Sequence, residues 1–300
     1  MRRWLKHVNN MAIYKINNQK VIKCSIKEEG FGDEFALRDF FADNLEELLG
    51  IRFIDKEYAI LEGRIDTLGL DENNSPVIIE YKWKENEEVL AQGLFYYNWL
   101  LKNKKHFELL VENKLSKDTK VNWEQPRVIL IARGFGRYIL GAVQQESHIE
   151  LVTYHYYQPD ILQLENIYTP TELKLPKRAI ATDTGVEYNL DYHLNTTSED
   201  IRKEFEILRS KILELPDVEE KAVQKSGITY KTTKSFARFE FRPTWIQVLV
   251  RDPKYPDDTN NLVKDVTSNE WGYKGMIKVT PDSDVEYIFG IIKQSYESTL

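Results

Sequence analysis

Hydrophobic and polar residues follow two different periods in the first fifty positions. Residues 11–16 and 21–26 have the composition of short strands around a polar turn, which predicts an N-terminal hairpin. From Asp33 onwards apolar residues recur at spacings of three and four, and this spacing stops near Gly50. An amphipathic helix with a glycine at its exit has this pattern, so we expect one helix over this stretch.

The next hundred residues have the pattern of a sheet interrupted by one helix. Strands are expected at 58–60, 64–70, 77–83, 107–111, 127–132 and 149–157, the last of these closing the series. The polar residues 71–76 form a turn between two of the strands, and 87–103 has a helical apolar stripe. We therefore predict an α/β (α+β) domain with a mixed central sheet flanked by helices.

The segment 168–198 interrupts these patterns, because it contains two prolines and many polar residues and has no sustained period. Beyond this expected linker, helices are predicted over 198–215 and 282–298. Strands are predicted between them at 228–232, 235–241, 245–250 and 273–279. The chain thus divides into a first domain, 1–167, which includes the hairpin, and a smaller α+β domain, 199–300.

Composition limits the class of protein. Three hundred residues, 42% of them hydrophobic, are enough for two packed cores. The single cysteine, Cys24, excludes an intramolecular disulfide framework. No stretch approaches the roughly 18 consecutive apolar residues that a bilayer-spanning helix requires. We expect a cytoplasmic protein of a reducing compartment, without a membrane partner.

The formal charge of −7 counts against tight, nonspecific binding to long duplexes, because affinity for phosphate comes largely from Lys and Arg. Binding requires only a local basic rim, however, and a carboxylate-lined metal site itself lowers the total charge. The charge therefore weakens a nucleic-acid function without excluding it.

The chemistry-bearing residues lie on two consecutive predicted strands. Asp66 is on the first, and Glu80 and Lys82 are on the second, where strand alternation directs both to one face. Two carboxylates suit Mg²⁺ or Mn²⁺, which prefer hard oxygen ligands. A metal ion there could activate water, while Lys82 orients that water or screens developing negative charge. Taken alone, such a trio more often forms a solvated sheet edge.

Asp66 followed by Glu80-Tyr81-Lys82 resembles the PD-(D/E)xK motif of restriction-endonuclease-like nucleases. Ile65 stands in the place of the motif's proline, as in divergent branches of that superfamily. The neighbouring residues are similar to its NucS-like and RecB-like branches. The resemblance implies a restriction-endonuclease-like core in which Asp66, Glu80 and the Tyr81 carbonyl hold the metal and Lys82 serves catalysis.

Two further segments strengthen the resemblance. Gln92 and Tyr96 are similar to a Gln-x-x-x-Tyr motif that such nucleases carry near the bound strand, and Glu34 resembles an acidic residue of their first helix. The resemblance implies that Glu34 assists the metal through a water and that Gln92 and Tyr96 position the site or the scissile strand. Arg64 would contact phosphate.

The expected function is a metal-dependent nuclease, endo- or exonucleolytic, that hydrolyses DNA phosphodiester bonds. The alternative is a catalytically silent module on the same fold that binds nucleic acid or protein. The last hundred residues resemble a C-terminal domain of unknown function found attached to nuclease-like modules, which we expect to select a substrate or a protein partner. A homodimer would ease double-strand cleavage, although nothing in the sequence specifies an interface.

Three other features carry both an ordinary and a functional interpretation. Residues 102–106 form either a basic helix end or a phosphate contact, and 133–137 form either a turn or part of a nucleic-acid surface. The aromatic residues of 154–157 and 236–245 offer faces for base stacking, but strand alternation explains most of them as core.

Overall fold

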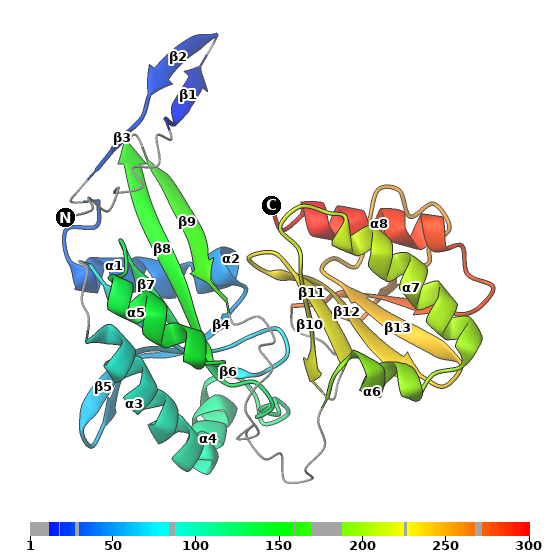
Figure 1. The fold of residues 1–300 in the computed structure, drawn as a ribbon, viewed down its shortest axis with the longest axis horizontal. Coiled ribbons are helices and arrows are strands. Elements are labelled where there is room, and N and C mark those ends of the chain that lie inside the picture. The colour runs from blue at the N-terminus through cyan, green and yellow to red at the C-terminus, as the bar shows by residue number, and fades with distance from the viewer. Residues whose placement is uncertain are drawn as a thin grey trace, which may run out of the picture.

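The computed structural model describes residues 12–17, 19–27, 30–83, 88–158, 160–169, 188–224, 227–267 and 272–300. In these ranges the chain forms two large β-sheets, each packed with its own helices (Figure 1). A two-stranded ribbon, β1 (Tyr14–Asn17) and β2 (Lys20–Lys23), projects from the first domain. The predicted N-terminal hairpin is thus present, and the overall class is α+β.

The first sheet has the strand order β3-β8-β7-β6-β5-β4, with β9 also paired to β8. Its strands are β3 (Ser25–Ile26), β4 (Arg52–Ile60), β5 (Gly63–Leu70), β6 (Pro76–Lys82), β7 (Arg127–Ala132), β8 (Ile149–Gln158) and β9 (Ile161–Tyr168). Strands β4, β5 and β6 are antiparallel, whereas β6, β7 and β8 are parallel. The sheet is therefore mixed, as predicted, and the carboxyl ends of β6, β7 and β8 lie at one edge.

Helices cover both faces of this sheet. Helices α1 (Glu34–Asp43) and α2 (Leu45–Leu49) lie on one face, α3 (Val89–Lys102) and α4 (Lys104–Lys114) lie on the other, and α5 (Arg137–Ala142) with the 3₁₀ turn η1 (Val143–Gln145) connects β7 to β8. Alternate residues of β6 serve the two cores: Val77 and Ile79 pack with α1 and α2, and Ile78 packs with α3. This burial on both sides explains the unbroken apolar run of β6.

The helix expected from Asp33 to Gly50 is interrupted at Asn44. Asp33 caps α1 by accepting the backbone N–H of Ala36 at 2.8 Å, and Asn44 ends α1 and begins α2. Gly50 ends α2 with a φ of 65°, the left-handed conformation that favours glycine. The predicted end of the helical region is confirmed, but its continuity is wrong.

The strand predicted at 107–111 is wrong, because these residues belong to helix α4. Phe107 and Val111 are buried one helical turn apart, whereas Leu109 is 59% exposed. A short apolar run fits a strand or a helix equally well, and packing against the sheet decides between them. The series of strands also continues past residue 157, since β9 adds an edge strand that the sequence did not predict.

The second domain has an antiparallel six-stranded sheet of order β10-β11-β12-β13-β15-β14. Its strands are β10 (Glu219–Gln224), β11 (Gly227–Lys231), β12 (Ser235–Arg242), β13 (Trp245–Val250), β14 (Lys264–Asp265) and β15 (Gly275–Val279), of which β10 and β14 were not predicted. Helices α7 (Glu199–Leu213) and α8 (Val285–Glu297) pack on the sheet. Helix α6 (Leu190–Asn195) lies within the predicted linker and packs on this domain, with His193 stacked on Phe241.

The turn between β5 and β6 connects the two domains. The Glu72 carboxylate is buried, accepts the backbone N–H of Ser235 at 3.1 Å and lies 3.3 Å from the guanidinium of Arg251. Arg238 donates to the side chain of Asn73 at 3.1 Å. The same turn therefore links the strands that carry the predicted catalytic residues and anchors the second domain.

Among the described helices, none is long and apolar enough to cross a membrane.

Candidate functional site

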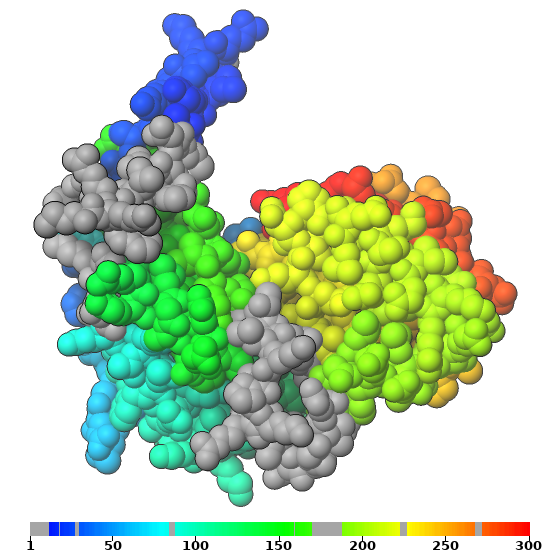
Figure 2. Space-filling model, in the orientation of Figure 1, coloured from blue at the N-terminus to red at the C-terminus, as the bar shows by residue number. Residues whose placement is uncertain are grey.

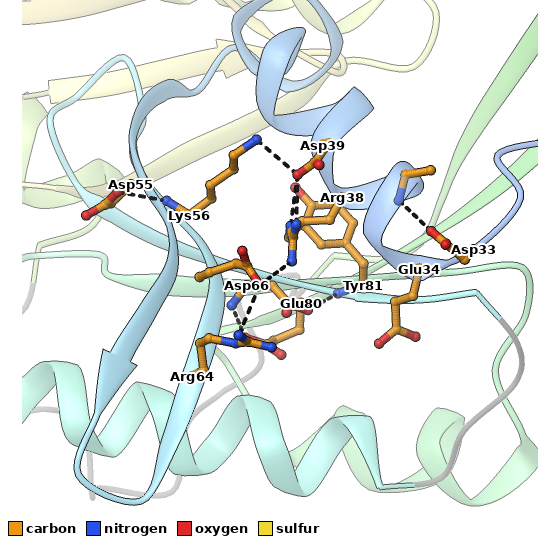
Figure 3. Close-up of polar contacts among 12 residues, drawn as sticks. Asp33, Glu34, Arg38, Asp39, Asp55, Lys56, Arg64, Asp66, Glu80 and Tyr81 are labelled. Atoms are coloured by element: carbon orange, nitrogen blue, oxygen red, sulfur yellow. Dashed lines mark hydrogen bonds and ion pairs between the residues drawn. The ribbon is translucent and has the colours of Figure 1, made fainter.

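The predicted site lies where the pairing of β5 with β6 ends. Thr67 and Ile79 are the last paired residues at this end of the ladder. Beyond them, side chains replace the ladder: Glu80 accepts the backbone N–H of Asp66 at 3.1 Å, and Asp66 accepts the backbone N–H of Tyr81 at 3.1 Å. Figure 3 shows the two carboxylates next to each other on these strands. Backbone amides thus hold both acids at one fixed position.

Burial makes the ionised form of this carboxylate pair unfavourable. Glu80 is fully buried, and its Oε2 has no hydrogen-bond partner among the described residues. Burial and the charge of Asp66 raise the pKa of Glu80 well above its ordinary value. Burial also raises the pKa of Asp66, against the opposing effects of the Tyr81 N–H and Lys82. Two ionised acids here repel each other, and a cation would relieve the repulsion.

This donor set fits a divalent cation of the hard class. The described residues contain no group of three or more His, Cys, Asp or Glu placed to hold a metal. Mg²⁺ binds proteins through one or two carboxylates and retains water in the remaining positions, so Asp66 and Glu80 are sufficient. The unpartnered Glu80 Oε2 is an oxygen donor that such an ion would satisfy.

Lys82 is held by an acid from helix α1. Its Nζ lies 2.9 Å from Glu34 Oε1, and the other Glu34 oxygen accepts the backbone N–H of Trp83 at 3.2 Å. Burial alone would lower the pKa of Lys82, but the hydrogen bond to Glu34 and the nearby carboxylates raise it. Lys82 is therefore an ammonium group, a donor and a positive charge rather than a base.

Gln92 and Tyr96 support the strand end that carries Arg64. They lie one turn apart on α3, and the Tyr96 hydroxyl accepts from Gln92 Nε2 and from the Arg64 backbone N–H, each at 3.2 Å. A Cβ on Gly63 would lie 2.8 Å from that hydroxyl, so glycine permits the close approach. The structure thus brings Gln92 and Tyr96 to the site as supports of β5.

Replacing Tyr96 with phenylalanine is expected to lower the free energy of unfolding by about 1 kcal/mol, because the Arg64 N–H loses its acceptor. Tyr138→Phe is the matched control, since the Tyr138 side chain is 62% exposed. Removal of its hydroxyl should change the free energy of unfolding by less than about 0.5 kcal/mol. Urea unfolding of both variants measures the difference. Equal stabilities would mean that the Tyr96 hydroxyl does not hold β5.

Arg38 and Glu57 also lie at the site, and neither was predicted from the sequence. Arg38 of α1 is buried and forms an ion pair with Glu57 at 2.9 Å, and Arg64 reaches the same Glu57 oxygen at 3.1 Å. The β4–β5 register places Glu57 opposite Asp66, with a φ of 52°. Glu57 thus holds two guanidinium groups beside Asp66.

The pKa of Arg38 reflects this environment. Burial alone would lower it, but the hydrogen bond and charge of Asp39 and the charges of Glu57 and Asp66 raise it. One sequence signal for Arg38 exists, since it lies four residues after Glu34 and therefore on the same helical face. Glu57 carries no such signal, because only the twisted backbone of β4 directs it to the site.

The two basic segments noted in the sequence, 102–106 and 133–137, lie at different distances from this site. Arg133 follows β7, whose last residue pairs with Lys82, and its guanidinium lies 5.7 Å from the centre of the Trp83 ring. Lys104 instead lies over Trp123, 5.2 Å from the ring centre, at the start of α4. The basic turn after β7 is thus the one that borders the site.

Residues 34–119 match the Endonuclease NucS C-terminal domain. This segment holds all of the predicted site residues, which are Glu34, Arg64, Asp66, Glu80, Tyr81, Lys82, Gln92 and Tyr96. The match confirms the predicted resemblance to restriction-endonuclease-like nucleases, and the mixed sheet flanked by helices agrees with it. The NucS-type segment ends within the loop that follows α4, so β7, β8 and β9 lie outside it.

The second domain and the whole chain have relatives without an assigned function. Residues 190–299 match the family described as Domain of unknown function (DUF5655), and the match begins at α6. An uncharacterized protein of Haemophilus influenzae is 29% identical over 289 residues, which cover 90% of this chain and 95% of that protein. The combination of both domains in one chain therefore recurs in that relative.

Two solved structures overlay loosely on the chain. One, described as an EndoMS–dsDNA2 complex, has 14% identity and a TM-score of 0.30 and covers 54% of this chain and 66% of its own. The other, a repair endonuclease from Pyrococcus abyssi, has 16% identity and a TM-score of 0.28 and covers 45% of this chain and 46% of its own. The chain spans less than two thirds of either structure's length.

Proposed function

We propose that this protein is a nuclease that hydrolyses DNA phosphodiester bonds at Asp66, Glu80 and Lys82 with Mg²⁺ or Mn²⁺. The observation that carries the proposal is the buried Asp66–Glu80 pair, with an unpartnered Glu80 oxygen, beside an ammonium group. Its location within the segment that matches a NucS endonuclease domain supports nuclease chemistry.

Asp66 and Glu80 would hold the ion, with the Tyr81 backbone carbonyl as a further oxygen ligand. When bound, the ion supplies a water of lowered pKa and offsets negative charge on the phosphorus. Backbone amides already fix one oxygen of each acid, so the pair does not need to rearrange. This preorganisation favours charge stabilisation at the moment of reaction.

Lys82 keeps its proton and donates a hydrogen bond to the attacking water or to a phosphate oxygen. Glu34 holds the ammonium in position through its 2.9 Å contact. Arg64, which is half exposed, and the buried Arg38 carry positive charge on the opposite side of Asp66. Together these cations offset the charge of a phosphate that approaches the two acids.

Lys82→Ala is expected to lower the cleavage rate by at least about a hundredfold, because one charged donor to the reacting group is lost. The substrates are labelled single-stranded, duplex and branched DNA, each with Mg²⁺ and with Mn²⁺. Lys203→Ala is the control, since Lys203 is an exposed lysine of α7 in the second domain. Cleavage by wild type and the control but not by Lys82→Ala locates the site, and the shortened label identifies the substrate form.

The alternative is a silent binding module on the same fold, favoured by the formal charge of −7 and by the pairing of Lys82 with Glu34. It predicts that wild type binds DNA or a protein partner without cutting any of the three substrates. Cleavage by Lys82→Ala at the wild-type rate would also contradict the proposed site.

A further inference from the structure

The ribbon formed by β1 and β2 extends away from the body of the first domain (Figures 1 and 2). Every residue of both strands is exposed. The antiparallel register places Lys15 opposite Ile22 and Asn17 opposite Lys20. One face therefore carries Lys15, Asn17, Lys20 and Ile22. The ribbon also exposes several large apolar side chains, Tyr14, Ile16, Val21 and Ile22, and a group of exposed apolar residues indicates an interaction surface.

The ribbon lies in the most basic part of the chain. No acidic residue precedes Glu28, whereas Arg2, Arg3, Lys6, Lys15, Lys20, Lys23 and Lys27 all occur before it. The whole chain nevertheless has a formal charge of −7. Lys15 and Lys20 are exposed and form no ion pair within the described part of the chain. This local charge is complementary to a polyanion.

The ribbon also leaves the sheet at the edge where the candidate site lies. Lys82 pairs with Ala132, which pairs with Thr153 of β8. Strand β8 continues in the same direction to Gln158, where it pairs with β3 at the base of the ribbon. That extension is about 17 Å of strand, the length of about five base pairs of duplex.

Phe31 and the residues after it tie this end of the chain to the site. The Phe31 ring packs against Phe40 and Tyr154, with ring centres 5.0 and 5.8 Å apart. Three residues later Glu34 holds Lys82. The segment from Phe31 to Glu34, which follows the ribbon in the chain, thus packs beside the site.

We propose that the ribbon is a DNA-binding arm that lies in a groove of the duplex whose backbone reaches the Asp66–Glu80–Lys82 site. The major groove admits a two-stranded β-ribbon. Lys15 and Lys20 bind backbone phosphates and release counterions, and the opposite face, with Tyr14, Ile16 and Val21, contacts sugar and base edges. The choice of DNA rests on the proposed function.

The test is duplex binding by the full chain in EDTA, where no cleavage is required. The variant Lys15→Gln/Lys20→Gln is compared with Lys254→Gln/Lys293→Gln, which removes the same charge from exposed lysines of the second domain. Fluorescence anisotropy gives Kd over a range of salt concentrations. Loss of two phosphate contacts is expected to weaken binding about 30-fold at about 0.15 M salt and to reduce the log–log salt slope by about 1.8.

The control should bind as wild type does, and circular dichroism should show all three proteins folded. The expected loss supports the arm even if wild type cuts no DNA, so the nuclease proposal can fail separately. Unchanged Kd and slope in the ribbon variant, or no duplex binding by wild type, overturn the arm even if DNA is cut. A changed mass in light scattering with unchanged DNA binding would assign the ribbon to a second copy of the chain instead.

Discussion

Glu80→Gln is expected to lower metal-dependent cleavage by about a thousandfold, since a lost metal ligand removes several kcal/mol of charge stabilisation. The same change should raise the Tm of the metal-free protein. Glutamine keeps an oxygen that accepts the Asp66 N–H, but it removes one of two buried charges that repel each other. Activity and stability should therefore change in opposite directions.

The pH dependence of stability provides a second readout of this repulsion. Because the pKa of Glu80 is raised in the folded state, the folded protein binds its proton more tightly than the unfolded chain does. Metal-free wild type should therefore lose stability as the pH rises above about 4.5, the ordinary pKa of a glutamate side chain. Glu80→Gln should lose less over the same range.

Thermal unfolding in EDTA at several pH values, and again with Mg²⁺, measures both effects. Glu112→Gln is the matched control, because Glu112 is an exposed residue of α4. It should resemble wild type in activity and in its pH profile. A Glu80→Gln variant that is less stable than wild type in EDTA at neutral pH would show that the carboxylate pair is not strained.

Arg127→Ala is expected to lower the free energy of unfolding by about 3–5 kcal/mol, because it removes the cation that pairs with the buried Asp71 carboxylate and one of those beside Glu150. The Arg127 guanidinium contacts Asp71, and its Nε lies 3.2 Å from Glu150. Burial alone would raise the pKa of Glu150, but nearby cations, Lys231, Lys221 and Arg127, lower it. Lys221 reaches Glu150 from the second domain at 3.2 Å.

Urea unfolding followed by fluorescence and by circular dichroism measures this loss and shows whether the two domains still unfold together. Arg137→Ala is the control, since Arg137 lies in α5 and its contact is to the exposed Tyr138. Its effect should be within about 0.5 kcal/mol. An Arg127→Ala variant as stable as this control would mean that the buried charges are satisfied by other groups.

The core of the candidate site follows from local sequence. A short turn joins β5 to β6, and the register that pairs Leu68 with Ile78 brings Asp66 opposite Glu80. Alternation along the strand then directs Lys82 to the same face as Glu80. Helical spacing likewise places Gln92 and Tyr96 one turn apart. These relations depend on neighbours in the chain, so periodicity alone determines them.

The tertiary structure decided what surrounds that core. It made 107–111 a helix, because Phe107 and Val111 pack on the sheet, and it joined Arg38 and Arg64 through Glu57. It also buried Glu72 between the domains and placed the partly buried Arg127 against Glu150. Partners in these contacts are distant in sequence, and the pKa of a charged group depends on the burial and neighbours that packing creates. Periodicity along the chain predicts neither these distant contacts nor the pKa shifts that they cause. It does predict the spacing of Asp66, Glu80 and Lys82.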